Sequence, residues 1–148
     1  MPQEIDYLRE IVTRCRDGGT LHPELANWLG GCLDAFLTRR VRDIDEAFGL
    51  RMGRGGMPWW MEEAVRKRDG ALRALARHRN LPPSVRGKAR VICDLANRYA
   101  ASAWRIDKER DEMPPAYAGT PKEYLWIAFR SGAPMPIGER QLRMILGH

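Results

Sequence analysis

Apolar and polar side chains alternate along the chain mostly with the period of an α-helix. The first apolar run recurs at three- and four-residue steps with charges between its members: Ile5, Leu8, Val12 and Cys15. This spacing places all four on one face of an amphipathic helix, which Gly18-Gly19 ends. Strict alternation, which is typical of strands, occurs nowhere. The pattern therefore predicts an all-α protein.

A second helix is predicted from Pro23, at the first helical position, to about Thr38. Its apolar set is wide enough for a central, well-buried helix: Leu25, Trp28, Leu29, Cys32, Leu33, Phe36 and Leu37. Gly30-Gly31 lies in its middle, where each glycine costs about 1 kcal/mol relative to alanine. We expect the close approach of a neighbouring helix to explain the pair, with a ligand as the less favoured alternative.

The middle of the chain predicts a short helix from Asp43 to Phe48, in which Asp43 caps while Glu46 reaches back. The segment 51–57 has no periodicity and is predicted to be a loop.

Two long helices follow this loop. The first runs from Pro58 to about Arg79, and only the aliphatic part of Arg68 is expected to face inward. The second begins after Ser84 as N-cap and keeps helical spacing over 85–108.

The C-terminal part predicts two further helices. Thr120-Pro121-Lys122-Glu123 has the composition of a capping box and begins a helix that ends at Gly132. A short terminal helix follows over 139–146, where Leu142, Ile145 and Leu146 are expected to close the bundle. The whole pattern predicts a single-domain irregular helical bundle of about six or seven helices over residues 1–148. A helix-turn-helix at the C-terminus, with Arg140, Gln141 and Arg143 reading bases, is a less favoured alternative because its connection is long.

The charge of the chain is unevenly distributed. Residues 1–50 carry 6 basic and 9 acidic side chains, whereas residues 51–110 carry 15 basic and 6 acidic ones. Arginine, the better bidentate ligand of phosphate, accounts for 21 of the 25 basic residues. Such clustering attracts nucleic acid or an acidic protein surface. A merely solvated helical face explains the same pattern about as well.

The candidate binding residues lie in the basic middle of the chain. If the two long helices are antiparallel neighbours, their outer faces form one basic ridge, and Asp69, Asp94 and Asp107 counter it by pairing within their own helices. Trp59 and Trp60 point about 100° apart, so one of them is expected to be exposed. Trp104 is a candidate for stacking on an unpaired base. The full set of predicted nucleic-acid or partner contacts is Arg51, Arg54, Trp59, Trp60, Arg66, Lys67, Arg73, Arg77, Arg86, Lys88, Arg90, Arg98, Trp104 and Arg105.

Signatures of catalysis and of metal binding are missing from the sequence. His22, His78 and His148 have no neighbours at metal-ligand spacing, and the segment 53–56 lacks the ending of a P-loop. Cys15, Cys32 and Cys93 are interpreted as reduced core residues. No apolar run is long enough for a membrane span and no targeting segment is recognisable. We therefore expect a cytoplasmic, non-enzymatic protein without a cofactor, a metal or a membrane partner.

Three phrases carry a resemblance to short helical proteins of high-GC proteobacteria and their mobile elements. They are Pro58-Trp59-Trp60, the run 98–104 (RYAASAW) and the run 138–143 (GERQLR). That group has no established function, so no functional residue is carried over. Two hypotheses follow. The favoured one is a binding protein for nucleic acid or a nucleoprotein complex, and the alternative is a protein-interaction module, such as a mobile-element-encoded inhibitor of a host defence complex of the anti-CRISPR type.

Overall fold

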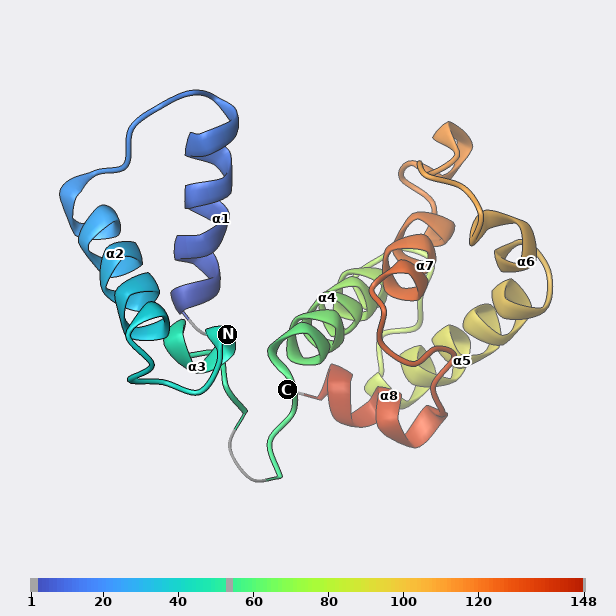
Figure 1. Cartoon of the computed structure of the whole chain (residues 1–148). Coiled ribbons are helices and arrows are strands. Elements are labelled where there is room, and N and C mark those ends of the chain that lie inside the picture. The colour runs from blue at the N-terminus through green and yellow to red at the C-terminus, as the bar shows by residue number, and fades with distance from the viewer. Residues whose placement is uncertain (1–2, 53–54, 148) are drawn as a thin grey trace. The chain divides into compact units, whose positions relative to one another are not determined.

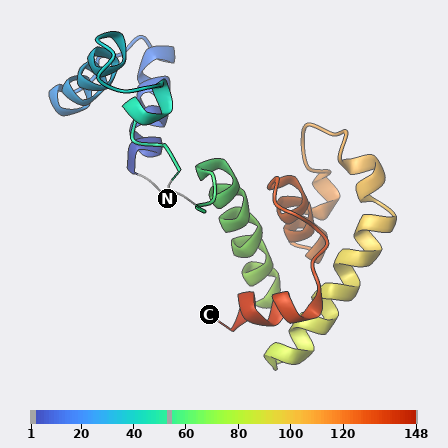
Figure 2. The ribbon, with the colours of Figure 1, turned by 60° about the horizontal axis from the view of Figure 1, so that its bottom comes forward.

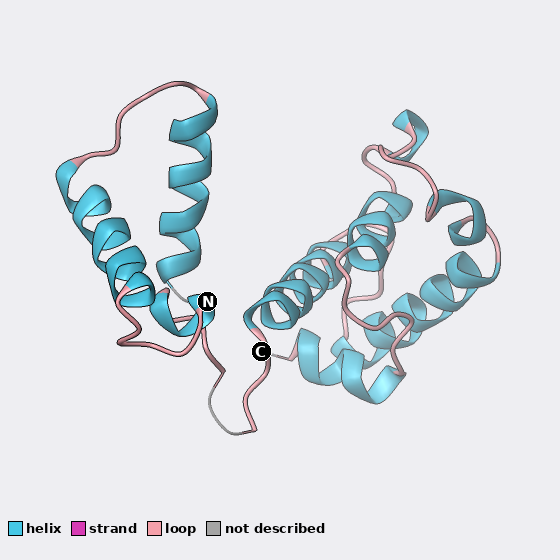
Figure 3. Cartoon of the chain, in the orientation of Figure 1, coloured by secondary structure: helices cyan, strands magenta, loops and turns pink. Residues whose placement is uncertain are grey.

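The computed structural model describes residues 3–52 and 55–147, and all regular structure in these two ranges is helical. The all-α fold is therefore confirmed (Figures 1 and 3). The elements are α1 (Gln3–Arg16), α2 (Pro23–Leu37), α3 (Ile44–Ala47), α4 (Trp59–Ala76), α5 (Val85–Ala101), α6 (Trp104–Asp107), η1 (Pro115–Tyr117), α7 (Pro121–Arg130) and α8 (Glu139–Leu146). Among the described helices, none combines the length and the apolar character needed to cross a bilayer.

Backbone contacts group the chain into two compact units, Met1–Glu62 and Glu63–His148, which we call the N-terminal and C-terminal units. The aperiodic segment after α3 precedes the boundary, which falls in the first turns of α4. The organisation of residues 1–148 as a single domain stays a prediction.

Aromatic rings join the helices of the N-terminal unit. The ring of Trp28 on α2 meets Tyr7 of α1 edge-on, with 5.2 Å between ring centroids, and stacks on Phe48 after α3 at 5.7 Å. The predicted cap of α3 is confirmed, since Asp43 Oδ1 accepts a hydrogen bond from the amide of Glu46 at 2.8 Å. Glu46 reaches back and accepts from the amide of Arg42.

The prediction that the second helix is well buried is wrong. Leu25 is the fully buried residue of α2, whereas Leu33 and Leu37 are 39% and 76% exposed. The predicted close approach at Gly30-Gly31 is also wrong, because a Cβ added to either glycine meets no atom within 4 Å in the described chain. Only part of the apolar surface of this helix is thus buried within its own unit.

The core of the C-terminal unit is shared by α4, α5, α7 and α8. Its fully buried side chains come from all four helices: Leu72, Leu75, Ile92, Leu125 and Leu142. Helix α5 packs chiefly against α8 and also against α6 and α7. Figure 2 shows α4 and α5 on either side of α7, with α8 crossing at one end. Burial of Leu142 and Ile145 confirms that the terminal helix closes this bundle.

The predicted helix over 85–108 is broken in two. Helix α5 ends at Ala101, and a new turn, α6, begins at Trp104. The break brings Asp107 back over α5, where its carboxylate accepts a 2.8 Å hydrogen bond from the Tyr99 hydroxyl. In an unbroken helix these residues would be separated by about 12 Å of axial rise. The buried hydrogen bond therefore requires the break.

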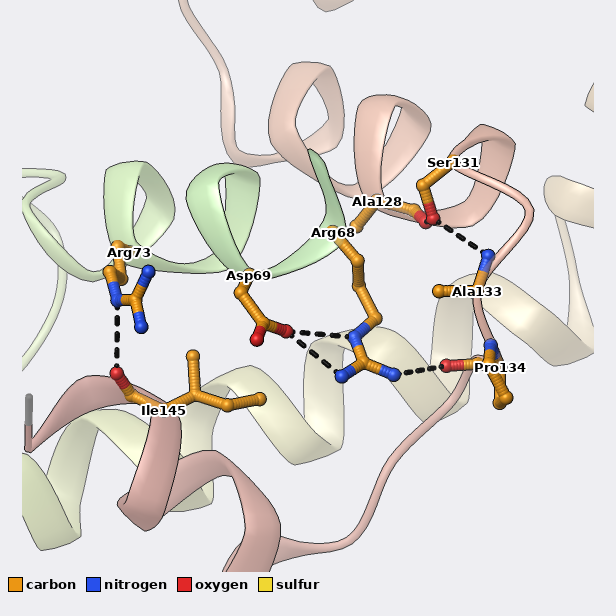
Figure 4. A network of polar contacts seen from close by, with 8 residues as sticks. All are labelled: Arg68, Asp69, Arg73, Ala128, Ser131, Ala133, Pro134 and Ile145. Carbon is orange, nitrogen blue, oxygen red and sulfur yellow. Dashed lines mark hydrogen bonds and ion pairs between the residues drawn. The ribbon is translucent and has the colours of Figure 1, made fainter. Parts of the chain in front are cut away.

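Buried polar contacts tie α4 to the chain that follows α7 (Figure 4). Arg68 is 3% exposed, so the expectation that only its aliphatic part faces inward is wrong. Its guanidinium donates to the Asp69 carboxylate at 2.9 Å and to the carbonyl of Pro134 at 3.2 Å. Farther along α4, Arg73 Nε donates to the carbonyl of Ile145 at 3.1 Å. Hydrogen bonds and the ion pair offset the desolvation cost of burying this guanidinium, which an unpaired guanidinium would carry in full.

The helix start predicted at Thr120-Pro121 is confirmed, but the predicted capping box does not form. Glu123 reaches back and accepts a 2.9 Å hydrogen bond from the amide of Gly119. The Thr120 hydroxyl, however, donates to the carbonyl of Tyr117 and does not cap α7. The preceding 3-10 turn places that carbonyl within reach of the hydroxyl, and it takes the side chain away from the helix.

Candidate nucleic-acid interface

Positive charge is concentrated in the C-terminal unit. Residues 63–148 contain 17 Lys and Arg against 9 Asp and Glu, a net charge of +8, whereas residues 1–62 contain 8 and 10, a net charge of −2. One of the nine acidic side chains, Asp107, is buried. One of the 17 basic side chains, Arg68, is buried as well, so the net charge of the surface stays at +8.

The densest group of unpaired cations lies where α4 ends and α5 begins. We define this basic corner as Arg77, Arg79, Arg86 and Arg90, all of which are exposed. The stretch 77–93 contains no Asp or Glu at all. Within the described residues none of the four guanidinium groups has an ion-pair partner. These charges are consequently available to an external anion.

The local chain geometry fixes how the connection meets the start of α5. Ser84 caps α5, its Oγ accepting a 3.0 Å hydrogen bond from the amide of Gly87. A Cβ at Gly87 would lie only 2.9 Å from Cβ of Pro82, so glycine allows the connection to fold closely over the first turn of the helix. Arg86 and Arg90 lie on the first two turns of α5, directly after the connection that carries Arg77 and Arg79.

Two open depressions flank this connection. One, of about 500 Å³, is lined by Arg86, Arg90 and Glu139 together with the cap residues. The other, of about 410 Å³, is lined by Arg77, His78, Arg79 and Tyr124, among others. A guanidinium can donate two parallel hydrogen bonds to one phosphate. The corner thus offers four guanidinium groups to phosphate within the segment 77–90.

The basic side chains of α4 and α5 do not form the single ridge that was predicted from the sequence. Since α4 and α5 flank α7, they are not the antiparallel neighbours that the ridge assumed. Arg77 follows the end of α4, and Arg86 and Arg90 lie on the first two turns of α5. Arg98 lies about 12 Å of helix rise beyond Arg90, and it is exposed there together with Arg105. Arg66 and Lys67 are exposed on the outer side of α4, and Lys67 lies 4.0 Å from Glu63.

Three of the predicted contact residues are partly buried within the C-terminal unit. Arg73 is half-buried and bound to the end of α8, as described above. Lys88 is also only half exposed. The ring of Trp104 packs among Tyr99, Trp126 and Phe129, with centroids 5.3 to 6.2 Å away, so the expectation of a free stacking platform is wrong. Burying the ring against three aromatic neighbours gains more apolar contact than leaving it in water.

The remaining predicted contacts belong to the N-terminal unit. Arg51 Nη1 lies 3.4 Å from Glu46 Oε2 on the surface, and Arg54 lies outside the described residues. The expectation for the tryptophan pair is confirmed, because Trp60 is 57% exposed and Trp59 is half-buried. The two rings meet edge-on at 5.9 Å.

Sequence reasoning missed Arg79 and the hydrogen-bond centre at Asp107. Arg79 could have been found from the acid-free stretch 77–93, which extends across the helix boundary. Asp107 accepts 2.8 Å hydrogen bonds from both Tyr99 and Tyr117 and pairs with Arg110 at 3.3 Å. Burial, and then the bond to Asp107, raises the pKa of the Tyr99 hydroxyl and of the Tyr117 hydroxyl. This centre stabilises the α5–α6 turn and lies within the unit.

The cysteines do not all behave as core residues. Cys32 and Cys93 are half-buried, but Cys15 is exposed, which corrects the prediction for that residue. Burial, followed by the nearby Glu4 carboxylate, raises the pKa of the Cys32 thiol. Among the described residues there is no group of three His, Cys, Asp or Glu side chains that could hold a metal ion.

Comparison of the chain with protein-family models, with curated proteins and with solved structures finds no match.

Proposed function

We propose that this protein binds nucleic acid, alone or in a nucleoprotein complex, through the basic corner, and that it acts as a binding protein and not as an enzyme. The observation that carries the proposal is the set of four exposed guanidinium groups without an ion-pair partner among the described residues, in a unit with a net charge of +8. Each phosphate that such a group neutralises releases condensed counterions, which favours binding.

The surroundings of the corner also support a phosphate ligand. The N-terminal turn of α5 contributes the positive end of its helix dipole next to Arg86 and Arg90. Opposing this, Glu139 lines the same depression. Two cations, Arg86 and Arg90, line this depression together with that one carboxylate. The balance of charge at the corner is therefore positive.

The proposal predicts salt-sensitive binding that depends on the corner. We would measure fluorescence anisotropy of labelled duplex DNA, single-stranded DNA and RNA with the full chain at several salt concentrations. The triple variant Arg79→Gln/Arg86→Gln/Arg90→Gln should bind at least about tenfold more weakly, and its slope of log K against log salt on duplex DNA should fall by about 3, because roughly one phosphate contact is lost per arginine.

A matched control removes the same charge elsewhere in the unit. Arg98→Gln/Arg105→Gln/Lys108→Gln changes three exposed cations beyond the corner, and it should retain most of the affinity. Equal losses in both triple variants would mean that total charge, and not the corner, drives binding. Absence of binding to all three probes at low salt would refute the proposed function.

A second candidate function, docking to a protein, is favoured by a separate observation. Exposed apolar side chains surround the start of α4: Met52, Met57 and Trp60 are each about half exposed. Tryptophan is among the commonest anchors of protein interfaces. A host defence complex is one possible partner protein for these apolar side chains. This candidate gains weight if nucleic acid fails to bind.

A further inference from the structure

Helix α2 has two apolar faces, and its own unit covers only one of them. The inner face carries the partly or fully buried side chains Leu25, Trp28, Cys32 and Phe36, which face the rest of the unit. The outer face carries Ala26, Gly30, Leu33 and Leu37, and all four are exposed. A helix that is apolar on both sides is normally packed on both sides. The outer face therefore lacks a partner within the N-terminal unit.

The outer face has the spacing of a helix-pairing seam. Its four residues follow one another at steps of four, three and four, which is the a/d repeat of a coiled coil. The two glycines in the middle of the helix cost about 1 kcal/mol each relative to alanine, and nothing in the described chain packs on them. Gly30 is part of the seam, so the close approach of a helix from outside gives this glycine a role, whereas Gly31 points away from the seam.

The size order along the seam is complementary to itself in one direction only. In an antiparallel pair related by a two-fold axis, Ala26 lies opposite Leu37 of the second copy and Gly30 lies opposite Leu33. Each large side chain then faces a small one, so the two surfaces interlock at high density. A parallel pair would instead set leucine against leucine and glycine against glycine, which leaves voids.

Charge does not oppose this pairing. The antiparallel arrangement sets the two helix dipoles in opposite directions, which is favourable. The N-terminal unit carries a net charge of only −2, so two copies of it repel each other little.

We infer that the outer face of α2 pairs with the same face of a second copy of this chain, antiparallel and across a two-fold axis. The interface is isologous, so every contact occurs twice. Two copies of the basic C-terminal unit are thereby carried in one particle. The inference stands on the N-terminal unit alone and does not depend on the proposed function.

Sedimentation velocity of the full chain over about 1 to 100 µM tests the pairing. The wild type should form a dimer in this range. Leu33→Asp buries a carboxylate twice per interface and should weaken the dimer about a hundredfold. Because Leu33 is exposed in the single chain, the variant should keep the wild-type helix content and midpoint of unfolding measured under monomeric conditions.

Val12→Asp is the matched control, since Val12 is an exposed apolar residue of the same unit outside the seam. It should leave the dimer unchanged. A wild type that is monomeric at 100 µM would overturn the inference and leave the face to a helix of another protein. A Leu33→Asp variant that dimerises as tightly as the wild type would overturn it as well.

Cysteine cross-linking tests the direction of the pair. In a chain whose Cys15, Cys32 and Cys93 are replaced by serine, Ala26→Cys/Leu37→Cys should form a disulfide-linked dimer on mild oxidation, because the antiparallel register brings these positions together. Neither single variant should do so, and positions 26 and 37 of one helix are about 16 Å apart, too far for an internal disulfide. Cross-linking by Ala26→Cys alone would indicate a parallel pair and contradict the proposed geometry.

Discussion

Arg68 and Asp69 hold the connection between α7 and α8 against α4. The guanidinium donates one hydrogen bond to Asp69 at 2.9 Å and one to the carbonyl of Pro134 at 3.2 Å, and it forms an ion pair with Asp69 at 2.9 Å (Figure 4). Ser131 adds to the same region by donating to the carbonyl of Ala128 and accepting from the amide of Ala133. These contacts fix the chain segment that leads into α8, which in turn closes the core.

Replacing Arg68 by methionine should destabilise the protein strongly. The change keeps the apolar stem but leaves the Asp69 carboxylate and the Pro134 carbonyl without their donor, at a cost of about 3 kcal/mol in the free energy of unfolding. Urea denaturation measures the loss. Arg77→Met, at an exposed arginine of the same unit, should change stability by less than about 0.5 kcal/mol. Similar values for the two variants would show that the buried contacts contribute little.

At the scale of the elements, the ends of the helices place the candidate site. Helix α4 ends at Ala76 and not at the predicted Arg79, so Arg77 and Arg79 belong to the turn that leads to α5. Ser84 then begins α5 by capping it, and Gly87 lets Pro82 approach. Two helix ends thus place the corner arginines on the turn and on the first two turns of the next helix, and one glycine allows the close packing at that start.

Gly87→Ala should lower stability although alanine favours helices. The new Cβ would meet Cβ of Pro82 and Oγ of Ser84 at 2.9 Å, and a proline ring cannot turn aside. We expect a loss of about 1 to 3 kcal/mol. Gly70→Ala is the control: it lies inside α4 with no atom within 4 Å of the added Cβ, and it should gain up to about 1 kcal/mol. Thermal unfolding of both variants measures the difference, and a gain in both would refute the close approach.

At the scale of the whole molecule, the chain combines a near-neutral unit that presents an unpaired apolar seam with a basic unit that presents a corner of free arginines. If the first forms dimers and the second binds nucleic acid, one particle carries two basic corners. Two linked sites bind a long ligand more tightly than either site alone, because the second contact is intramolecular.

The two proposals together predict a length dependence. Leu33→Asp should weaken binding to a duplex of about 60 base pairs at least tenfold, since avidity is lost, and should leave binding to a duplex of about 12 base pairs nearly unchanged. Anisotropy titrations with both duplexes measure this, with Val12→Asp as the control. An equal loss on both duplexes would indicate that α2 itself contacts the nucleic acid.

Local sequence determined which segments are helical and where several of them begin. Asp43 and Ser84 cap their helices as predicted, and the terminal helix spans Glu139–Leu146 in both the prediction and the structure. These features depend on side chains within four residues of one another, so a local pattern contains all the information they need. The excess of positive charge in the middle of the chain is likewise a property of the sequence.

Tertiary structure alone decided which faces are covered. The apolar pattern of α2 is the same whether Leu33 and Leu37 are buried or exposed, and only the position of the other helices shows that they are exposed. Trp104 and Arg68 reversed their expected roles because partners distant in sequence, Phe129 and Pro134, come beside them. The predicted ridge along α4 and α5 does not form, because α7 lies between these two helices. Burial and neighbourhood arise from contacts between distant parts of the chain, and periodicity along one helix does not specify them.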